Sequence, residues 1–377
     1  MGKARTLLLV VTEDWYLASH RLPLIRASVK AGWNVLAVTR IRDHGAQIAA
    51  AGAELIPLPI SREGRNPLRE LAGVRTLAEL YRERCPDIVH HVGIKPILYG
   101  GWAARWAGCP RVVQAFAGLG HLYTSDRAGL TRSLVNAALR PVTRARCTRI
   151  LVQNADDAAV LEQHGVAAPG AIRIIRGGGV DLQRFAPSAL PGGDPAVILP
   201  ARMLATKGVR EFIAAARHLR KEGCPGRFVL AGRIDPANPD SLTATELQSV
   251  VDEGVVEWLD HVESMPELFR MSSIVALPSY REGMPKSLLE AAACGRPIVA
   301  TDVPGCRDIV RHGWNGMLVP PRDSHALASA LRDLIEDRAL RELMGQRGRE
   351  RAEKEFSDVA AADQTVALYD ELMACLR

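Results

Sequence analysis

Short apolar runs rich in valine, isoleucine and leucine alternate with longer amphipathic segments through the first half of the chain. We expect the short runs to form β-strands over residues 7–11, 34–38, 88–91, 111–116, 149–153 and 172–175. We expect the longer segments to form helices over residues 20–30, 67–84, 97–106, 130–147 and 155–164. This alternation predicts βαβ units and a parallel sheet.

The alternation restarts after a segment rich in proline and glycine at residues 187–195, which is typical of a linker. Further strands are expected over residues 197–200, 227–231, 255–258, 274–277, 297–300 and 317–319. The chain is therefore predicted to be an α/β protein with two Rossmann-like domains, an N-terminal one over residues 1–187 and a C-terminal one over residues 188–355. Ligands of such sheets bind beyond the carboxyl ends of the strands, so two facing domains would hold a ligand in the cleft between them.

Two glutamates, Glu282 and Glu290, follow a predicted strand in the C-terminal domain. Glu282 is expected in the loop, and Glu290 about two turns into an alanine-rich helix over residues 287–294. Gly283 permits close approach of the backbone, and Pro285 suits the first turn of a helix. The N–H groups of that turn favour an anion such as a diphosphate, and carboxylates beside it can accept hydrogen bonds from sugar hydroxyls. On spacing alone, a glutamate that merely favours the helix dipole is the commoner explanation.

Two cations, Arg202 and Lys207, follow the first predicted strand of the C-terminal domain. A guanidinium fork and an ammonium group in such a loop are suited to clamp a phosphate and to stabilise a departing diphosphate without a metal. Solvated surface cations are the alternative explanation.

Loops of the N-terminal domain carry further candidates. Gly118 and Gly120 open the backbone around His121 at the end of a predicted strand, and Lys95 follows another strand end. A histidine or lysine without a catalytic role is the commoner case, so both interpretations stay open. The loop over residues 12–21 is placed for ligand contact, but it has no glycine and is not a dinucleotide fingerprint.

Composition and charge exclude several classes of protein. The net charge of +6 over 377 residues fits an anionic ligand or weak attraction to anionic lipid. No basic arm, zinc finger or aromatic-basic RNA motif occurs, so no nucleic-acid partner is expected. The seven cysteines show no Cys-x-x-Cys spacing, which favours a reducing cytoplasm over a disulfide framework or a zinc site. No apolar run reaches membrane-spanning length, so any membrane contact is expected to be peripheral, at the inner face of the cytoplasmic membrane.

Together these residues resemble family 4 of the retaining glycosyltransferases, which have the GT-B fold. The resemblance spans nearly the whole chain and is most specific in three phrases, namely Glu282-x7-Glu290, Gly295-Arg-Pro297 and Asp302-Val-Pro-Gly305. The Arg202-x4-Lys207 pair stands at the matching place. Phrases around His91, Gly118 and Val303 are similar to those of a subgroup that builds bacterial surface polysaccharide or glycan on a polyprenyl diphosphate lipid.

The resemblance implies a role for each motif. Arg202 and Lys207 would bind the donor diphosphate, Glu290 the ribose and Glu282 the donor sugar. The backbone beside Glu282 would lie against the sugar and the diphosphate, and His121 would lie near the far hydroxyl of the sugar or near the diphosphate. The fold would need no metal or other cofactor, and a C-terminal helix over residues 356–377 would pack on the N-terminal domain. The donor-binding set is Arg202, Lys207, Glu282, Gly283, Met284, Pro285 and Glu290, and the catalytic set is His121, Arg202, Lys207 and Glu282.

One departure from the family pattern changes the expected acceptor site. Many members carry a Gly-Gly pair after the first strand, close to the donor diphosphate, whereas this chain has none there. We therefore expect Ser19, His20 and Arg21, with Lys95, to recognise the acceptor. Cations in this region suit a lipid diphosphate, and aromatic side chains suit a sugar or a prenyl chain.

The expected reaction moves a hexose or an N-acetylhexosamine from a nucleotide sugar, UDP-linked in this interpretation, to a saccharide acceptor with retention. A nucleotide-sugar epimerase of the same architecture is one alternative and would need no acceptor. A phosphorylase would need inorganic phosphate and usually a pyridoxal cofactor, whose lysine is not identifiable here. A non-catalytic module that binds a sugar nucleotide is the third alternative.

Overall fold

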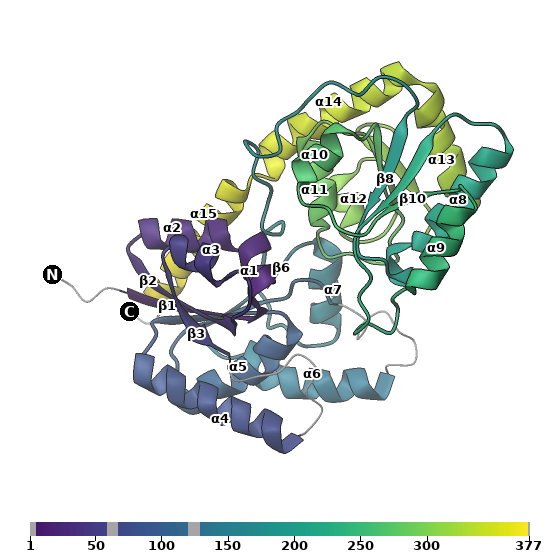
Figure 1. Cartoon of the computed structure of the whole chain (residues 1–377). Coiled ribbons are helices and arrows are strands. Elements are labelled where there is room, and N and C mark those ends of the chain that lie inside the picture. Colours follow the sequence, from purple (N-terminus) through teal and green to yellow (C-terminus); the bar gives the residue numbers. More distant parts are fainter. Residues whose placement is uncertain (1–4, 59–66, 120–128, 376–377) are drawn as a thin grey trace. The chain divides into compact units, whose positions relative to one another are not determined.

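The computed structural model describes residues 5–58, 67–119 and 129–375. The chain divides into two compact units, which are seen in Figure 1. Unit 1 runs from the N-terminus to Gly179 and also includes the segment that begins at Asp358, whereas unit 2 is continuous from Val180 to Ser357. Each unit is built on its own parallel sheet, so the predicted α/β class with two Rossmann-like domains is confirmed.

The sheet of unit 1 has seven parallel strands in the order β3-β2-β1-β4-β5-β6-β7. Successive side chains of the first strand, β1 (Arg5–Glu13), point to opposite faces of the sheet. Leu7, Leu9 and Val11 enter one apolar cluster, while Leu8 and Val10 enter another. Burial on both faces explains why this strand is a continuous apolar run. The strands are β1 (Arg5–Glu13), β2 (Trp33–Arg40), β3 (Ala53–Pro57), β4 (Ile88–Val92), β5 (Val112–Ala115), β6 (Thr148–Val152) and β7 (Ile172–Ile174).

Helices cover both faces of this sheet (Figure 1). One face packs against α1 (Asp14–His20), α2 (Leu22–Lys30), α3 (Gly45–Ala50) and α15 (Asp358–Ala374). The other face packs against α4 (Pro67–Arg84), α5 (Ile94–Ala107), α6 (Gly129–Thr143) and α7 (Ala155–Gln163).

The last helix, α15, is an integral part of unit 1. The Tyr369 hydroxyl lies 2.6 Å from His90 Nδ1 in a buried hydrogen bond between α15 and the central strand β4. Arg5 forms an ion pair of 2.8 Å with Asp370, and Arg111 Nε donates to the Leu372 carbonyl at 2.9 Å. These contacts confirm that the C-terminal helix packs on the N-terminal domain.

The first loop of unit 1 differs from the expectation, because a separate helix, α1, occupies residues that were expected to be irregular. The Asp14 carboxylate accepts hydrogen bonds from the backbone N–H groups of Arg42 and His44, at 2.7 and 3.0 Å. Asp14 is buried, and the neighbouring Glu13 pairs with Arg40 at 3.0 Å. These contacts with the segment after β2 hold the start of α1 directly at the end of β1. The helical backbone is interrupted at Arg21, which separates α1 from α2. The prediction also missed β3 and α3.

The sheet of unit 2 has six parallel strands in the order β10-β9-β8-β11-β12-β13. They are β8 (Ala196–Pro200), β9 (Arg227–Ala231), β10 (Glu257–Leu259), β11 (Ile274–Leu277), β12 (Ile298–Thr301) and β13 (Gly316–Val319). A short 3₁₀ turn, η3 (Ala205–Lys207), precedes the helices α8 (Val209–Lys221), α9 (Ala244–Asp252), α10 (Met265–Arg270), α11 (Lys286–Ala293), α12 (Cys306–Ile309), α13 (Ser324–Glu336) and α14 (Arg338–Glu355). The strand order reverses direction between β8 and β11, so the loops after these two strands are neighbours.

The segment after Gly179 belongs to unit 2, so the observed boundaries lie at 179/180 and 357/358, whereas the expected ones were 187/188 and 355/356. Arginines of unit 2 bind the carbonyl groups of this segment. Arg349 Nη1 donates to Leu182 and Phe185 at 3.3 and 3.0 Å, and Arg296, which is fully buried, donates to Ala189 at 3.4 Å.

Candidate active site

The predicted donor-site residues of unit 2 meet in the two neighbouring loops after β8 and β11. Lys207 Nζ lies 2.5 Å from Glu282 Oε1, and the Ser279 hydroxyl donates to the same carboxylate oxygen at 2.7 Å. The two charged side chains are partly buried and neutralise each other. Since the carboxyl ends of parallel strands at a reversal of strand order are the usual ligand site of such sheets, this pair stands where a ligand would bind.

Two glycines allow the loops of this site to touch. Gly208 has a φ of +73°, and a Cβ built on it would lie 2.1 Å from the Pro278 carbonyl oxygen. Gly305 has a φ of +79°, and a Cβ there would lie 2.4 Å from the Gly283 carbonyl oxygen. Any side chain at either position would force the loops apart. The loops after β8, β11 and β12 are thus locked together, with Glu282 between them.

Glu290 lies just past the middle of the eight-residue helix α11 and is more deeply buried than Glu282. It is the fifth residue of the helix and 7% exposed, so the expectation of two turns overestimated its distance from the helix start. Burial raises the pKa of its carboxyl to about 7, although Lys286 at 3.7 Å and the charge of Arg184 act to lower it. A buried carboxyl with a pKa raised to this extent is a candidate functional residue.

The start of α11 lies beside the same carboxylates. Pro285 is the N-cap residue of this eight-residue helix, so Lys286 is its first residue, and Met284 before it is buried. The structure therefore places Gly283, Met284 and Pro285 directly between Glu282 and the helix N-terminus. A helix N-terminus favours an anion, which agrees with the diphosphate that the resemblance implies.

Arg202 lies in the loop after β8, with a side chain that is 45% exposed. Its Nη1 is 2.5 Å from Oδ2 of Asp235, which follows β9 in the neighbouring part of the sheet. Asp235 was not among the predicted site residues. Its position just after β9 could have indicated it, because β8 and β9 are adjacent parallel strands whose carboxyl ends lie at the same edge of the sheet.

Unit 1 brings its predicted acceptor residues to a second reversal of strand order, between β1 and β4. Ser19 and His20 end α1, and the Ser19 hydroxyl lies 2.5 Å from His20 Nδ1. Lys95 is the second residue of α5, after β4, and its Nζ lies 3.1 Å from Glu70 Oε1. His121 lies outside the described residues.

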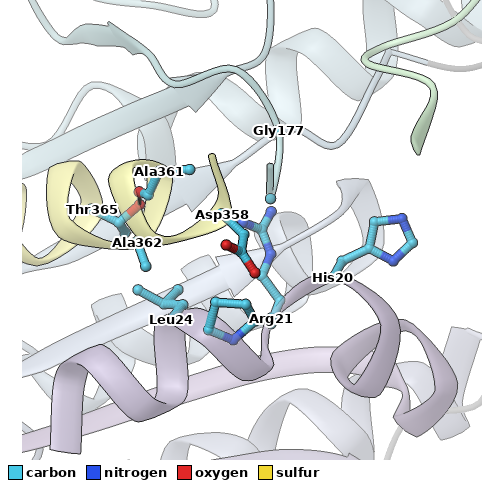
Figure 2. Close-up of a pocket in the computed structure, with 10 residues that line it drawn as sticks. His20, Arg21, Leu24, Gly177, Asp358, Ala361, Ala362 and Thr365 are labelled. Atoms are coloured by element: carbon cyan, nitrogen blue, oxygen red, sulfur yellow. Dashed lines mark hydrogen bonds between the residues drawn. The ribbon is translucent and has the colours of Figure 1, made fainter. Parts of the chain in front are cut away.

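Arg21 is 7% exposed and lines two adjoining cavities of unit 1. Figure 2 shows its side chain pointing from the start of α2 toward Gly177, with Asp358 and Thr365 of α15 on another wall. Each cavity has a volume of about 10 Å³, which is room for one water molecule and too little for a sugar. Arg21 therefore contacts the interior of unit 1, and a role in acceptor binding stays a prediction.

The two adjacent histidines of β4 point to opposite faces of the sheet, as expected for a strand. His90 contacts Tyr369 of α15, whereas His91 Nδ1 lies 2.9 Å from Gln114 Oε1 and its Nε2 3.1 Å from the Tyr81 hydroxyl. Both imidazoles are fully buried, and burial lowers the pKa of His91 to about 4. Within the described ranges, no three His, Cys, Asp or Glu side chains are grouped to hold a metal ion.

Two family comparisons divide the chain in the same way as the fold. Residues 6–154 match the family described as Glycosyl transferase 4-like, and residues 194–337 match the family described as Glycosyl transferases group 1. The chain belongs to the family 4 glycosyltransferases. The predicted class of enzyme, a glycosyltransferase of the GT-B fold, is thereby confirmed.

Bacterial relatives of this glycosyltransferase are similar over most of their length. It is 27% identical over 368 residues to N,N'-diacetylbacillosaminyl-diphospho-undecaprenol alpha-1,3-N-acetylgalactosaminyltransferase of Campylobacter jejuni, covering 94% of this chain and 95% of that one. It is 25% identical over 321 residues to UDP-Gal:alpha-D-GlcNAc-diphosphoundecaprenol alpha-1,3-galactosyltransferase of Escherichia coli, covering 81% of each.

Solved structures share the fold of the glycosyltransferase. Sucrose-phosphate synthase from Thermosynechococcus elongatus superposes with a TM-score of 0.82 at 23% identity, covering 98% of this chain and 99% of that one. HepE from Anabaena in complex with UDP and glucose gives 0.78 at 19% identity, covering 97% and 100%. Among the described residues of the glycosyltransferase, no helix is both long and apolar enough to cross a membrane.

Proposed function

We propose that this glycosyltransferase moves a hexose or an N-acetylhexosamine from a UDP-linked donor to a saccharide on a polyprenyl diphosphate lipid, with retention at the sugar carbon. The observation that carries the proposal is the Lys207–Glu282 pair at the strand-order reversal of unit 2. The two relatives above, which are named for diphospho-undecaprenol acceptors, support the choice of acceptor, and one of them is named for UDP-Gal.

Each side chain of the site has a distinct task in this proposal. The Lys207 ammonium and the Arg202 guanidinium neutralise the charge that grows on the departing diphosphate. The Glu282 carboxylate accepts hydrogen bonds from hydroxyls of the donor sugar, and Glu290 accepts them from the ribose. The donor diphosphate must share Lys207 with Glu282, because the Lys207 ammonium already pairs with that carboxylate.

The reaction then needs no carboxylate nucleophile. The acceptor oxygen bonds to the sugar carbon on the face that the diphosphate leaves, and the acceptor proton passes to an oxygen of the leaving phosphate. The electron pair of the broken bond stays on that phosphate. The enzyme contributes positioning and charge stabilisation.

A strong charge asymmetry supports an anionic acceptor and a peripheral membrane position. Residues 88–153 contain nine Lys and Arg residues and one acidic residue, Asp126, so this segment is more positive than the whole chain. On α6 and just after it, Arg140 and Arg144 are exposed, and Leu134 is 65% exposed. Each basic residue near an anionic membrane surface contributes about 1 kcal/mol of attraction. This face would hold unit 1 against the inner surface of the cytoplasmic membrane.

The test is a panel of nucleotide sugars, scored for UDP release with and without a polyprenyl-diphosphate-linked saccharide. Release that depends on the acceptor, with an α-linked product from an α-linked donor, is expected. Sugar interconversion without an acceptor would instead indicate an epimerase, and binding without turnover would indicate a non-catalytic module.

Lys207→Ala and Glu282→Ala should each reduce kcat by about 100-fold or more, with unchanged circular dichroism. Near-normal rates in both variants would defeat the site assignment.

The acceptor assignment has its own test. Lys95→Ala and Arg21→Lys should raise the KM for the lipid-linked acceptor and leave the KM for the donor unchanged. Charge reversal at Arg140 and Arg144 should reduce sedimentation with vesicles that contain anionic lipid, and leave sedimentation with neutral vesicles unchanged. An unaltered acceptor KM in both site variants would refute the acceptor role.

A further inference from the structure

Asp235 contacts the exposed guanidinium of the candidate donor site. We propose that Asp235 is a positioning residue that holds one edge of Arg202, so that the other N–H groups of the guanidinium meet the donor diphosphate. This inference rests on the proposed function, in which Arg202 binds that diphosphate. Asp235 itself would not touch the reacting atoms.

The contact between Arg202 and Asp235 is short and uses only one nitrogen of the guanidinium. Arg202 Nη1 lies 2.5 Å from Asp235 Oδ2, and this is the only side-chain hydrogen bond of the guanidinium among the described residues. A guanidinium has five N–H donors in a rigid fork, so one bond to Asp235 leaves donors along its other edges. Two anions can thus share one arginine, a fixed carboxylate on one side and a mobile ligand on the other.

The need for such a partner follows from the exposure of Arg202. Its side chain is 45% exposed, and fixing a free arginine side chain costs rotamer entropy. Asp235 is only 20% exposed. An arginine that is already held loses less entropy when the ligand binds, which is the general gain from preorganisation.

The loop that carries Asp235 is itself rigid. The Asp235 N–H donates to the Ser241 hydroxyl at 2.9 Å, and the Asn238 N–H donates to the Asp235 carbonyl at 2.8 Å. The Asp240 N–H donates in turn to the Asn238 side chain at 3.0 Å. The backbone that carries the Asp235 carboxylate is therefore fixed by hydrogen bonds within its own turn.

The same loop is fastened to the loop of Arg202. The Met203 N–H donates to the Arg233 carbonyl at 2.9 Å, the Leu242 N–H to the Met203 carbonyl at 2.8 Å, and the Ala205 N–H to the Asp240 carbonyl at 2.8 Å. Gly232, with a φ of +153°, allows this closeness, since a Cβ there would lie 2.1 Å from the Ala201 carbonyl oxygen. Asp235 and Arg202 are thus held at a constant separation.

A matched pair in unit 2 separates this role from ordinary surface pairing. Arg217 and Glu253 form an ion pair of 2.7 Å whose side chains are 42% and 44% exposed, and Arg217 lies on α8, outside the loops of the site. Exposed pairs of this kind contribute little to the stability of a fold. Glu253→Ala therefore controls for the loss of an exposed carboxylate partner.

The experiment is a double-mutant cycle on donor kinetics with Asp235→Ala, Arg202→Ala and the double variant. Asp235→Ala should lower kcat/KM for the donor about tenfold and Arg202→Ala about 100-fold or more, while Glu253→Ala stays at the wild-type value. In the Arg202→Ala background, Asp235→Ala should have no further effect, because the side chain that it positions is gone. Asp235→Asn, which keeps the acceptor oxygen and loses the charge, should fall between wild type and Asp235→Ala.

Two results would overturn the inference while leaving the proposed function standing. In the first, Arg202→Ala lowers kcat/KM for the donor but Asp235→Ala leaves it at the wild-type value. In the second, Asp235→Ala lowers kcat/KM by the same factor with and without Arg202, which indicates a structural role. If Arg202→Ala itself turns over at the wild-type rate, the diphosphate role of Arg202 fails and the inference fails with it. Donor affinity measured by calorimetry should follow the same pattern as kcat/KM.

Discussion

Glu290 shows how one buried side chain can make a binding site sensitive to pH. Its carboxyl has a pKa of about 7 because burial disfavours the charge more than Lys286 and Arg184 favour it. A protonated carboxyl accepts hydrogen bonds from ribose hydroxyls less well than a carboxylate does. In the unliganded protein, the strong acceptor form of Glu290 therefore becomes dominant only above neutral pH.

We predict that donor affinity rises with pH across this pKa. Below pH 7, affinity for the donor should fall by up to about tenfold per pH unit, since binding then requires loss of a proton from Glu290. The measurement is calorimetry with UDP-glucose between pH 5.5 and 8.5, because its diphosphate has no group that titrates there. Glu290→Gln should bind more weakly at high pH and show a flat profile. A wild-type profile as flat as that of Glu290→Gln would contradict the role.

The same pKa has a consequence for stability with the opposite sign. Because the folded-state pKa is raised, Glu290 favours the fold most below its unfolded pKa near 4.5, and this contribution is lost as the pH rises through about 7. The free energy of unfolding of Glu290→Gln, relative to wild type, should therefore increase between pH 5 and pH 8. Urea unfolding of both proteins at the two pH values measures it.

Gly208 is the residue on which the contact between the two donor-site loops depends. Gly208→Ala should destabilise the protein by about 3 kcal/mol or more. The new Cβ would collide with the Pro278 carbonyl oxygen, and the positive φ is unfavourable for alanine. The substitution should also reduce turnover, since Lys207 and Glu282 are pushed apart.

Gly223 provides the matched control. Its φ of +74° is nearly that of Gly208, but a Cβ there has no neighbour within 4 Å. Gly223→Ala should therefore cost only the φ strain of about 1–2 kcal/mol and leave turnover unchanged. Equal losses of stability and activity in both variants would show that the close approach at Pro278 is unimportant.

At the scale of the elements, periodicity predicted the strands better than the helices that begin at a ligand site. Every central strand was found, because burial on both faces leaves a clear apolar run, as in residues 7–11. The helix α1 was missed because its first residue, Asp14, is satisfied by the backbone of Arg42 and His44, a contact that no local pattern reveals. Asp235 was missed for a related reason, since its importance depends on a partner 33 residues away.

The hydrogen bond between His90 and Tyr369 is the buried polar link between β4 and α15. Tyr369→Phe leaves His90 with no partner for either ring nitrogen among the described residues, since its Nε2 already has none. This variant should lose about 1–3 kcal/mol of unfolding free energy. Asp370→Ala, which removes only the exposed ion pair with Arg5, should lose less than about 1 kcal/mol. Urea denaturation of both variants tests the contrast, and equal losses would contradict it.

At the scale of the whole molecule, unit 2 is one continuous segment, whereas unit 1 is made of two segments far apart in the sequence. Residues 180–357 should therefore fold alone, with a cooperative thermal transition and affinity for the donor nucleotide. Residues 1–179 lack α15, so the apolar face that Leu368, Tyr369 and Leu372 cover would be open.

The fragment of residues 1–179 should accordingly be aggregation-prone, and addition of a peptide of residues 358–377 should restore a cooperative transition. A stable monomer of residues 1–179 without the peptide would contradict the structural role of α15. A peptide with Tyr369 and Leu372 replaced by aspartate is the control.

Because α15 follows unit 2 in the sequence, protein synthesis imposes an order on the folding of unit 1. Ribosomes add about 5–20 residues per second, so the sheet of unit 1 emerges many seconds before the helix that covers it. Unit 2 is translated in between and can fold as soon as Ser357 has left the ribosome. At that point the sheet of unit 1 still lacks α15, which carries Tyr369. The nascent chain therefore exposes this apolar face of unit 1 until α15 has been made.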